Sequence, residues 1–393
     1  MNSQINRTED VRHSEKLQSD VMAKMELNIS GVSGSFSLAE FTPKDASESL
    51  WAAYFTLSET IFREFNQRGR LPNREAVRLR FSTHNPLYTV KRWLVFDETG
   101  SAAASASLSY DTELSPDYES SSHIGQIQIA VVPSYRRKKI ATALLKHMIE
   151  TASAMGKDTV RADVDNSTGL DYCKYLRGEL VHKEVQHRLY SEDVDWQLVD
   201  NWLAKGRSRS LHTAIESFQD CPEKDIGEFS RIYTEIINQR PVGDMEQELI
   251  TTPESRRIEE HNYKRRGIEW HTMISREHDG QISAMTDLMY NPEEPHRIHQ
   301  YFTGVPARYR RKGLAKRLKA EMLRYIKEAF PDAEYITTST AKENKPMRAI
   351  NKQLGFMPKK TSYMFRWALK DLERRAIKVL SASDKVSSLK RKQ

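Results

Sequence analysis

A strand–turn–helix segment occurs twice in this chain, and the two copies keep the same register. The first begins near Gln126 and the second near residue 300, and matched positions differ by 174 throughout: Val131 corresponds to Val305, and Met148 to Met322. Chance repetition does not account well for a spacing that is constant across a strand, a turn and a helix. The pattern therefore predicts a duplicated domain.

The turn in the second copy is basic and leads directly into a helix. Four cations at positions 308 and 310–312 precede Gly313, and the helix is expected from Leu314 to about Glu328. A helix start leaves several backbone N–H groups without partners, and with the helix dipole they form an anion site suited to a pyrophosphate. Gly313 has no Cβ, so the backbone there can approach a phosphate closely.

Composition limits the classes of protein to which this chain can belong. The chain has 393 residues with 38% hydrophobic content, which suggests two or three soluble domains. No apolar run approaches the roughly 20 residues of a membrane span, and the N-terminus has no apolar signal core. We therefore expect a cytoplasmic protein without a membrane partner.

Cys173 and Cys221 are the only cysteines, which predicts neither a disulfide framework nor a metal site. Much of the net charge of +7 lies in the two turns, so an anionic cofactor explains it at least as well as nucleic acid does.

The two halves have the same predicted order: strand, helix, hairpin, strand, helix, strand, helix, strand. In the first half, Thr42 and Pro43 look like the start of a helix. Such a series predicts a mixed sheet with helices on both sides. The predicted divisions are a polar extension (1–34), a first domain (35–190), a linking helix (191–208), a second domain (209–369) and a charged, helical or frayed tail (370–393).

A second specific pattern follows the second turn. Asn344 is followed after ten residues by Leu354, Gly355 and Phe356, which is typical of a helix ended by a left-handed glycine. Together with the Arg-x-x-Gly-x-Ala turn, it resembles the GNAT superfamily of N-acetyltransferases, and tandem members of the mycothiol synthase type most closely. The resemblance implies an α/β (α+β) fold of two tandem domains, each with a mixed, mostly antiparallel sheet flanked by helices.

The resemblance also implies transfer of an acetyl group from acetyl-CoA to a small-molecule amine, with no metal. Pyrophosphate would lie on the N–H groups of residues 311–315, and the pantetheine arm would pair with the end of the preceding strand. Backbone N–H groups from Thr303 to Val305 would polarise the thioester carbonyl. The residues expected to bind the cofactor are Val305, Arg310, Arg311, Lys312, Gly313, Leu314, Ala315 and Asn344.

Many relatives carry a glutamate base eleven residues before the turn's first matched arginine, and here that residue is His299. A neutral imidazole can take the proton of an amine. Strand alternation would place His299, Tyr301, Thr303 and Val305 on one face. A water relay and His296 are the alternatives.

The general acid, which would protonate the CoA thiolate as it leaves, is less clear from the sequence. Relatives commonly place a tyrosine seven residues after the motif's asparagine, but this chain has Asn351 there. Tyr363 and Tyr301 are the possible substitutes, and water is the alternative. We take Tyr363 as the candidate.

The first half departs from the pattern. Lys139 stands where the second copy has Gly313, and Gly125 falls at the base position by the 174 spacing. Cys173 and Arg177 replace expected motif residues in its late helix. We therefore expect the first half to be degenerate, binding CoA weakly or not at all.

Two other classes of function stay open. A non-catalytic acyl-CoA-binding or regulatory protein is the main alternative, and Asn351 and the unusual base favour it. Nucleic-acid binding is disfavoured, because the chain shows no helix-turn-helix and no interleaving of aromatic and basic residues. The acceptor amine and the oligomeric state are not determined by the sequence.

Overall fold

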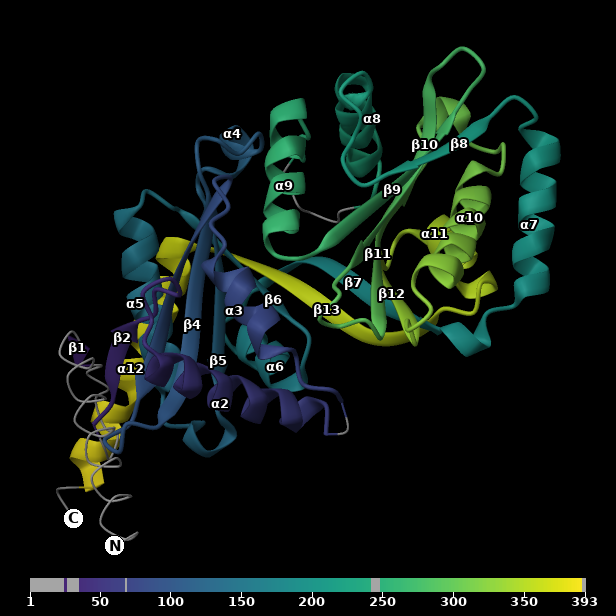
Figure 1. Cartoon of the computed structure of the whole chain (residues 1–393). Coiled ribbons are helices and arrows are strands. Elements are labelled where there is room, and N and C mark those ends of the chain that lie inside the picture. Colours follow the sequence, from purple (N-terminus) through teal and green to yellow (C-terminus); the bar gives the residue numbers. More distant parts are fainter. Residues whose placement is uncertain (1–24, 27–34, 68, 242–247, 391–393) are drawn as a thin grey trace, which may run out of the picture.

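The computed structural model describes residues 25–26, 35–67, 69–241 and 248–390 (Figure 1). Most of the predicted N-terminal extension, residues 1–34, lies outside this part of the chain. The described strands form a single 13-stranded sheet that runs through both halves. The α/β class with a mixed, mostly antiparallel sheet is therefore confirmed.

The first half of the chain forms the following elements: β1 (Met25–Glu26), β2 (Ser37–Glu40), α2 (Glu48–Phe65), α3 (Arg74–Ser82), β3 (Tyr88–Phe96), β4 (Ala102–Asp111), α4 (Tyr118–Ser121), β5 (Ile124–Val131), η1 (Pro133–Tyr135), α5 (Ile140–Ala154), β6 (Thr159–Val164), α6 (Ser167–Tyr175), β7 (Glu179–Tyr190), η2 (Ser191–Asp193) and α7 (Trp196–Arg209).

The second half repeats this series: β8 (Ala214–Phe218), α8 (Ile226–Asn238), α9 (Pro253–Arg265), β9 (Glu269–Arg276), β10 (Ile282–Tyr290), β11 (Arg297–Gly304), η3 (Ala307–Tyr309), α10 (Leu314–Ala329), β12 (Tyr335–Ala341), α11 (Lys345–Gln353), β13 (Met357–Ala368) and α12 (Leu369–Lys390).

The two halves exchange their last strands. The order in the sheet is β1-β2-β3-β4-β5-β6-β13-β7-β12-β11-β10-β9-β8. Thus β13, from the end of the chain, pairs with β6 of the first half, while β7 pairs with β12 of the second half. From β2 to β8 the order is symmetric about the β13–β7 pair, and Figure 1 shows these two long strands running between the halves. The predicted domain boundaries at 190 and 369 follow the sequence repeat. The pairing of β7 with β12, and of β13 with β6, nevertheless joins each predicted domain to the other.

Each exchanged strand carries its following helix with it. In α7, Val199 and Trp202 are buried in the same cluster as Leu318 of α10. In α12, Leu372 and Ala376 are fully buried in the core of the first half, with α5. The segment predicted as a linking helix and part of the segment predicted as a tail are therefore core elements.

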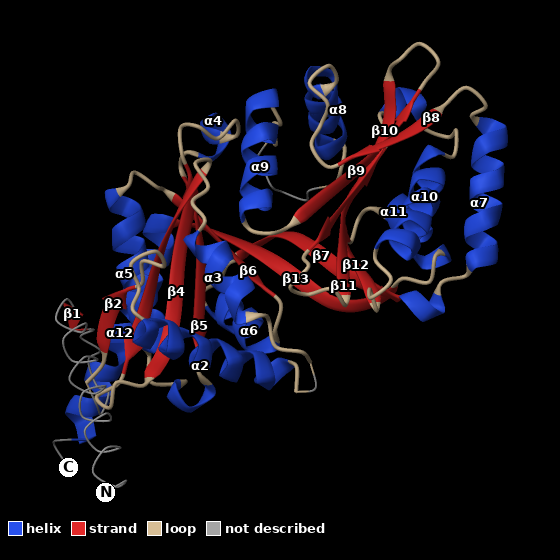
Figure 2. Cartoon of the chain, in the orientation of Figure 1, coloured by secondary structure: helices blue, strands red, loops and turns tan. Residues whose placement is uncertain are grey.

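The sheet is covered on both faces (Figure 2). In the first half, α5, α6 and α12 pack on one face and α2 and α3 on the other. In the second half, α7, α10 and α11 share one core, while α8 packs on the opposite face with α9 beside it. No helix in the described residues combines the length and apolarity needed to cross a membrane.

Local signals explain where several helices begin. The first long helix does not start at Thr42 and Pro43, which form a turn. It starts after Ser47, whose side chain accepts a hydrogen bond from the backbone of Leu50. The sequence reasoning overlooked α3 and α9, although each has a clear N-cap, Asn73 in α3 and Thr252 in α9.

Candidate functional site

The turns before α5 and α10 have the same backbone conformation. In the second half, Arg311 and Gly313 have φ of 69° and 85°, and in the first half Arg137 and Lys139 have 62° and 63°. Lys139 thus adopts the same left-handed conformation as Gly313. Its ammonium donates to the Leu380 carbonyl at 2.9 Å in the middle of α12. The turn of the first half therefore keeps its conformation with a lysine in place of the glycine.

Most cations of the second turn already have partners. Arg308 forms two hydrogen bonds with Glu235, at 2.7 and 3.0 Å, and Lys312 lies 3.8 Å from Glu277. Arg310 donates to the Val305 carbonyl and to the side chain of Gln239. The backbone N–H groups at the start of α10 are therefore the most direct anion donors at this turn.

One cation near this turn was missed by sequence reasoning. A Cβ placed on Gly313 would lie 4.0 Å from the guanidinium of Arg209, at the end of α7. Arg209 reaches this position because α7 packs along α10. No pattern in the sequence links these two helices.

In each half, two adjacent parallel strands separate after a short contact. β11 pairs with β12 only from Arg297 to His299, although both strands continue further. β5 and β6 likewise pair only from Ile124 to Gln126. Beyond these points the strand edges have no partner across the gap, so an extended group can enter between them.

A β-bulge interrupts β11 at Tyr301. Asp287 pairs with Phe302, but Leu288 pairs with Gln300, which leaves Tyr301 as the extra residue. Gln300 accordingly bonds Lys319 of α10, whereas Phe302 packs against Tyr233 of α8 on the other face.

The bulge corrects the expected grouping of side chains. Thr303 bonds Thr286, which also accepts from Gln300, so Thr303 lies on the α10 face together with Val305. His299 alternates with Ile298, which is buried in the α10 cluster, and therefore faces the α8–α9 side. The four residues do not share one face, because the extra residue shifts the alternation.

The bulge also changes the correspondence between the halves. Ile298 and Ile336 pair in the second half, and Gly125 and Val160 pair in the first. Gln126, rather than Gly125, therefore occupies the position of His299. Its side chain donates to Asp163 at 2.8 Å. The first half still has no imidazole or carboxylate at this position.

Hydrogen bonds define the protonation of His299. Its Nδ1 lies 3.1 Å from Thr337 Oγ1, and that hydroxyl donates its own hydrogen to the Ile298 carbonyl. Nδ1 is then the donor, so in the neutral imidazole the lone pair lies on Nε2. Burial, reinforced by the charge of Arg297, lowers the pKa of His299. Both effects favour a neutral imidazole with a free acceptor nitrogen.

Tyr301 lies beside His299. The two ring centroids are 6.1 Å apart, and Tyr301 is 44% exposed. Burial nevertheless raises the pKa of its phenol, so the hydroxyl keeps its proton at neutral pH.

Tyr363 is placed differently. It lies on β13, pairs with Val164 and Lys183, and packs against the core of the first half. Two strands, β7 and β12, separate β13 from β11 in the sheet. The structure therefore does not bring Tyr363 next to His299.

Asn344, Asn351 and the buried Lys319, which the sequence analysis did not single out, are held by local hydrogen bonds. Asn344 caps α11, accepting from the backbone of Met347 at 3.3 Å. Asn351 is completely buried and donates to Thr340 at 3.1 Å. Burial lowers the pKa of Lys319 to about 7, and its ammonium donates to Gln300 at 2.7 Å.

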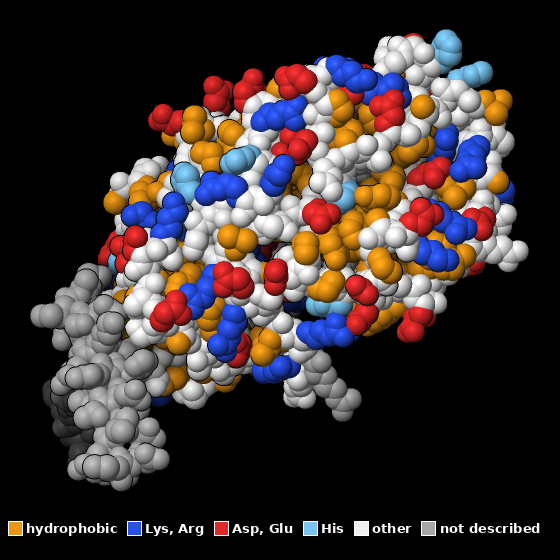
Figure 3. Space-filling view, viewed as in Figure 1, with side chains coloured by type: hydrophobic (Ala, Val, Ile, Leu, Met, Phe, Trp, Pro, Cys, Tyr) orange, Lys and Arg blue, Asp and Glu red, His pale blue; other side chains and the backbone are white. Residues whose placement is uncertain are grey.

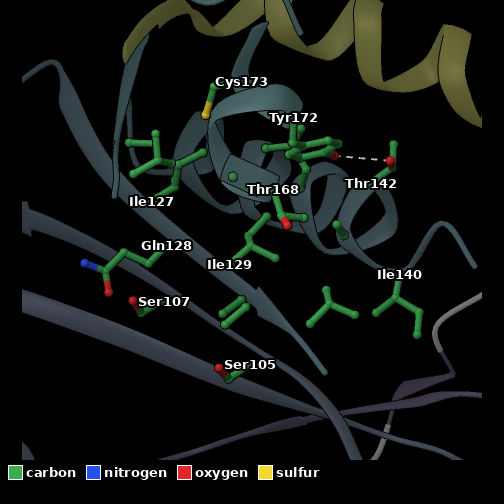
Figure 4. A pocket seen from close by; sticks show the side chains of 18 of the residues that line it. Ser105, Ser107, Ile127, Gln128, Ile129, Ile140, Thr142, Thr168, Tyr172 and Cys173 are labelled. Carbon is green, nitrogen blue, oxygen red and sulfur yellow. Dashed lines mark hydrogen bonds between the residues drawn. The ribbon is translucent and has the colours of Figure 1, made fainter. Parts of the chain in front are cut away.

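A large cavity lies in the first half, at the point where β5 and β6 separate. It measures about 960 Å³ and is bordered by the basic turn. Figure 4 shows its walls: Ser105 and Ser107 of β4, Gln128 and Ile129 of β5, Thr142 of α5, and Thr168 and Tyr172 of α6. Its volume is typical of a pocket for a cofactor or ligand of moderate size.

Charged residues such as Arg92, Arg136 and Asp163 line part of this cavity, but the phenol and the thiol on its α6 wall are neutral. The hydroxyls of Tyr172 and Thr142 lie 3.2 Å apart, and burial raises the pKa of Tyr172 to about 12. Burial also raises the pKa of the Cys173 thiol to about 12. The cavity therefore provides an apolar wall with hydroxyl groups, without a thiolate.

The surface charge does not form a single basic band on the face seen in Figure 3, where Lys and Arg alternate with Asp and Glu. This distribution gives no support to a nucleic-acid groove on that face.

Comparisons with known proteins identify the family of this chain. A family model described as the acetyltransferase (GNAT) family matches residues 51–174 and again residues 240–356. No match was found among curated proteins.

Several solved structures share the fold. A tandem GNAT protein from the clavulanic acid biosynthesis pathway is 18% identical, with a TM-score of 0.68 over 85% of this chain and 98% of that one. A GCN5-related N-acetyltransferase from Sphaerobacter thermophilus is 15% identical, with a TM-score of 0.57 over 85% of this chain and 96% of that one. Saccharomyces cerevisiae N-myristoyltransferase, solved with myristoyl-CoA, is 12% identical, with a TM-score of 0.51 over 87% of this chain and 80% of that one. Because all three sequence identities are below 25%, these matches show a shared fold and nothing more specific.

Proposed function

Because the chain belongs to the acetyltransferase (GNAT) family, we propose that it transfers an acyl group, acetyl by default, from acyl-CoA to a small-molecule amine. The observation that carries this proposal is the bulged strand β11. It presents His299 and Tyr301 side by side, and it leads into a turn whose helix start is suited to phosphate. The two free, buried cysteines support a cytoplasmic location.

The cofactor would be held by the second half. Backbone N–H groups of residues 311–315, around Gly313, would bind the pyrophosphate, and Arg310, Arg311 and Lys312 would offset its charge. The gap between β11 and β12 would receive the pantetheine arm, near Asn344. Backbone N–H groups between Thr303 and Val305 would polarise the thioester carbonyl.

His299 and Tyr301 would handle the protons. Acyl-CoA supplies the activated acyl carbon. His299 Nε2 takes the proton that the amine loses as the C–N bond forms. Tyr301 gives its proton to the sulfur as the C–S bond breaks, and the two residues then exchange protons with solvent. Tyr301 suits the acid role because it adjoins His299, whereas two strands separate Tyr363 from β11.

A second acyl-CoA site in the first half is supported by a separate observation. The cavity between β5 and β6 lies below a turn with the same backbone as the second turn. Gln126 replaces the base, so we propose that this site binds acyl-CoA without transferring the acyl group. Thr168→Trp would place an indole against the wall of the cavity and is expected to lower the number of acetyl-CoA molecules bound from two to one.

The main alternative is an acyl-CoA-binding or regulatory protein without turnover. A panel of amines assayed for free CoA, with wild type and His299→Gln, separates the two. An enzyme loses about 10²–10⁴ in kcat on this change and keeps its affinity for acetyl-CoA. Wild type that binds acetyl-CoA but releases CoA with no amine supports the alternative.

A further inference from the structure

We propose that Arg80, Arg266 and Arg297 bind a carboxylate or phosphate group on the acceptor amine. This inference rests on the acyltransferase function proposed above. The three side chains come from both halves: α3, the residue after α9, and the start of β11.

The residues around α3 join the halves next to this cluster. Asn73 donates to Glu293 and Asn85 to Glu259, both at 3.0 Å, and Arg70 pairs with Glu334 at 2.7 Å. The arginines therefore lie at a contact between the halves that is fixed by hydrogen bonds on several sides.

Aromatic rings position two guanidinium groups on the first-half side. Arg80 lies 5.1 Å and Arg92 lies 4.3 Å from the ring of Phe81, so the two cations flank a single side chain. Arg92 and Phe81 also line the cavity of the first half. The positive region thus extends from the cavity toward the second half.

On the second-half side, Arg266 lies 5.2 Å from the ring of Tyr263. Its Nε is buried and has no hydrogen-bond partner among the described residues. A buried guanidinium nitrogen without an acceptor is unusual, and an anionic oxygen bound to Arg266 would supply one.

The cluster has more positive than negative charge. Desolvation lowers the pKa of Arg80, and the nearby charges of Arg266 and Arg297 lower it as well, while Glu294 opposes them. Glu294 pairs with Arg297, and no described carboxylate lies within 4.0 Å of Arg80, Arg92 or Arg266. Arg80 and Arg297 are exposed, so an anion can reach the cluster from solvent, and guanidinium groups bind carboxylate and phosphate strongly.

The cluster lies close to the proposed base, because Arg297 and His299 are on the same strand. Arg297 and His299 alternate on the same face of β11, about 7 Å apart along the strand. An amine at His299 would therefore carry its anionic group only a few bonds away. Small amino acids and amino phosphates fit this spacing.

Matched acceptors test the proposal: glycine against glycinamide, and phosphoethanolamine against ethanolamine. Wild type should prefer the anionic member of at least one pair by about tenfold in kcat/KM, and Arg80→Gln and Arg266→Gln should reduce that preference severalfold. Arg74→Gln is the control, because it removes the same charge from α3 at a site already paired with Glu59. Equal rates for both members of both pairs in wild type would overturn the proposal.

A readout that needs no turnover separates this inference from the proposed function. Thermal unfolding is followed in inorganic phosphate and in sodium chloride at equal ionic strength. Saturable stabilisation by phosphate that Arg80→Gln and Arg266→Gln remove, and Arg74→Gln keeps, supports the site even if no acyl transfer is found. Absence of that stabilisation overturns it even in an active enzyme. Weaker acetyl-CoA binding by Arg80→Gln would also overturn it, because the cluster would then serve the phosphates of CoA.

Discussion

At the scale of single residues, the hydroxyl of Thr337 determines which nitrogen of His299 is free. Thr337→Val removes the acceptor of Nδ1–H and should lower kcat by about five- to tenfold. Thr337→Ser keeps the hydroxyl and should restore most of the rate. Steady-state kinetics with the best amine checks this. Equal rates for the Val and Ser variants would contradict the positioning role.

The pH dependence of catalysis follows from the same residue. Burial and Arg297 lower the pKa of His299, so its neutral form persists to a pH below the ordinary value of 6.5. The kcat/KM of wild type should fall only as the pH drops through that lowered pKa. His299→Gln should lose this acid limb. An unchanged limb in the variant would assign the titration to another group.

Lys319 allows a test of stability. Its pKa of about 7 in the folded state lies below its ordinary 10.5, so the unfolded chain binds more protons between these values. The contribution of Lys319 to stability should therefore rise with pH from about 7 to 10.5. Lys319→Met should flatten the pH dependence of the free energy of unfolding by on the order of a few kcal/mol. Urea unfolding at several pH values measures both slopes, and parallel slopes would refute the buried lysine's role.

At the scale of elements, the sequence predicted the turns, the strands before them and the helices after them. These features depend on local chemistry: basic residues, Gly313 and apolar spacing. The bulge at Tyr301 was not predictable, because one additional residue in an alternating strand leaves the composition unchanged. The bulge places Thr303 on the opposite face of the sheet from His299. It also makes Gln126, and not Gly125, the first-half residue that matches His299.

The packing of the exchanged strand β13 on the first half can be tested at Gly178. A Cβ there would lie 2.4 Å from the ring of Trp367, which is buried and bonded to the Leu176 carbonyl. Gly178→Val should therefore destabilise the protein by about 1–3 kcal/mol. Gly227→Ala, at an open site in α8, is the control. Similar urea midpoints for both variants would argue against this contact.

At the scale of the whole molecule, the exchange makes each half incomplete alone. The first half needs β13 and α12, and the second needs β7 and α7. The sequence repeat could not show this, because β7 and β13 carry equivalent residues and the apolar pattern does not specify which partner strand each one meets.

Fragments test this arrangement. Residues 1–208 and 209–393 produced separately should be insoluble or poorly folded, because each lacks a central strand and a core helix. Produced together, they should associate and recover the circular dichroism of the full chain. A soluble, cooperatively unfolding 1–208 fragment would show that the exchange is not required.

The central claim is that the second half holds the acyl-CoA used in the reaction. The most direct measurement is calorimetric titration of acetyl-CoA, paired with CoA release, for wild type, Gly313→Glu and Gly100→Glu. A carboxylate at Gly313 would repel the pyrophosphate, whereas the matched residue of the first half, Lys139, is a cation. Gly100 has a similar φ of 83° in a hairpin of the first half, so it controls for strain. We predict that Gly313→Glu loses one bound acetyl-CoA and all turnover, whereas Gly100→Glu behaves as wild type. Turnover that survives in Gly313→Glu would contradict the account and move the reaction to the first half.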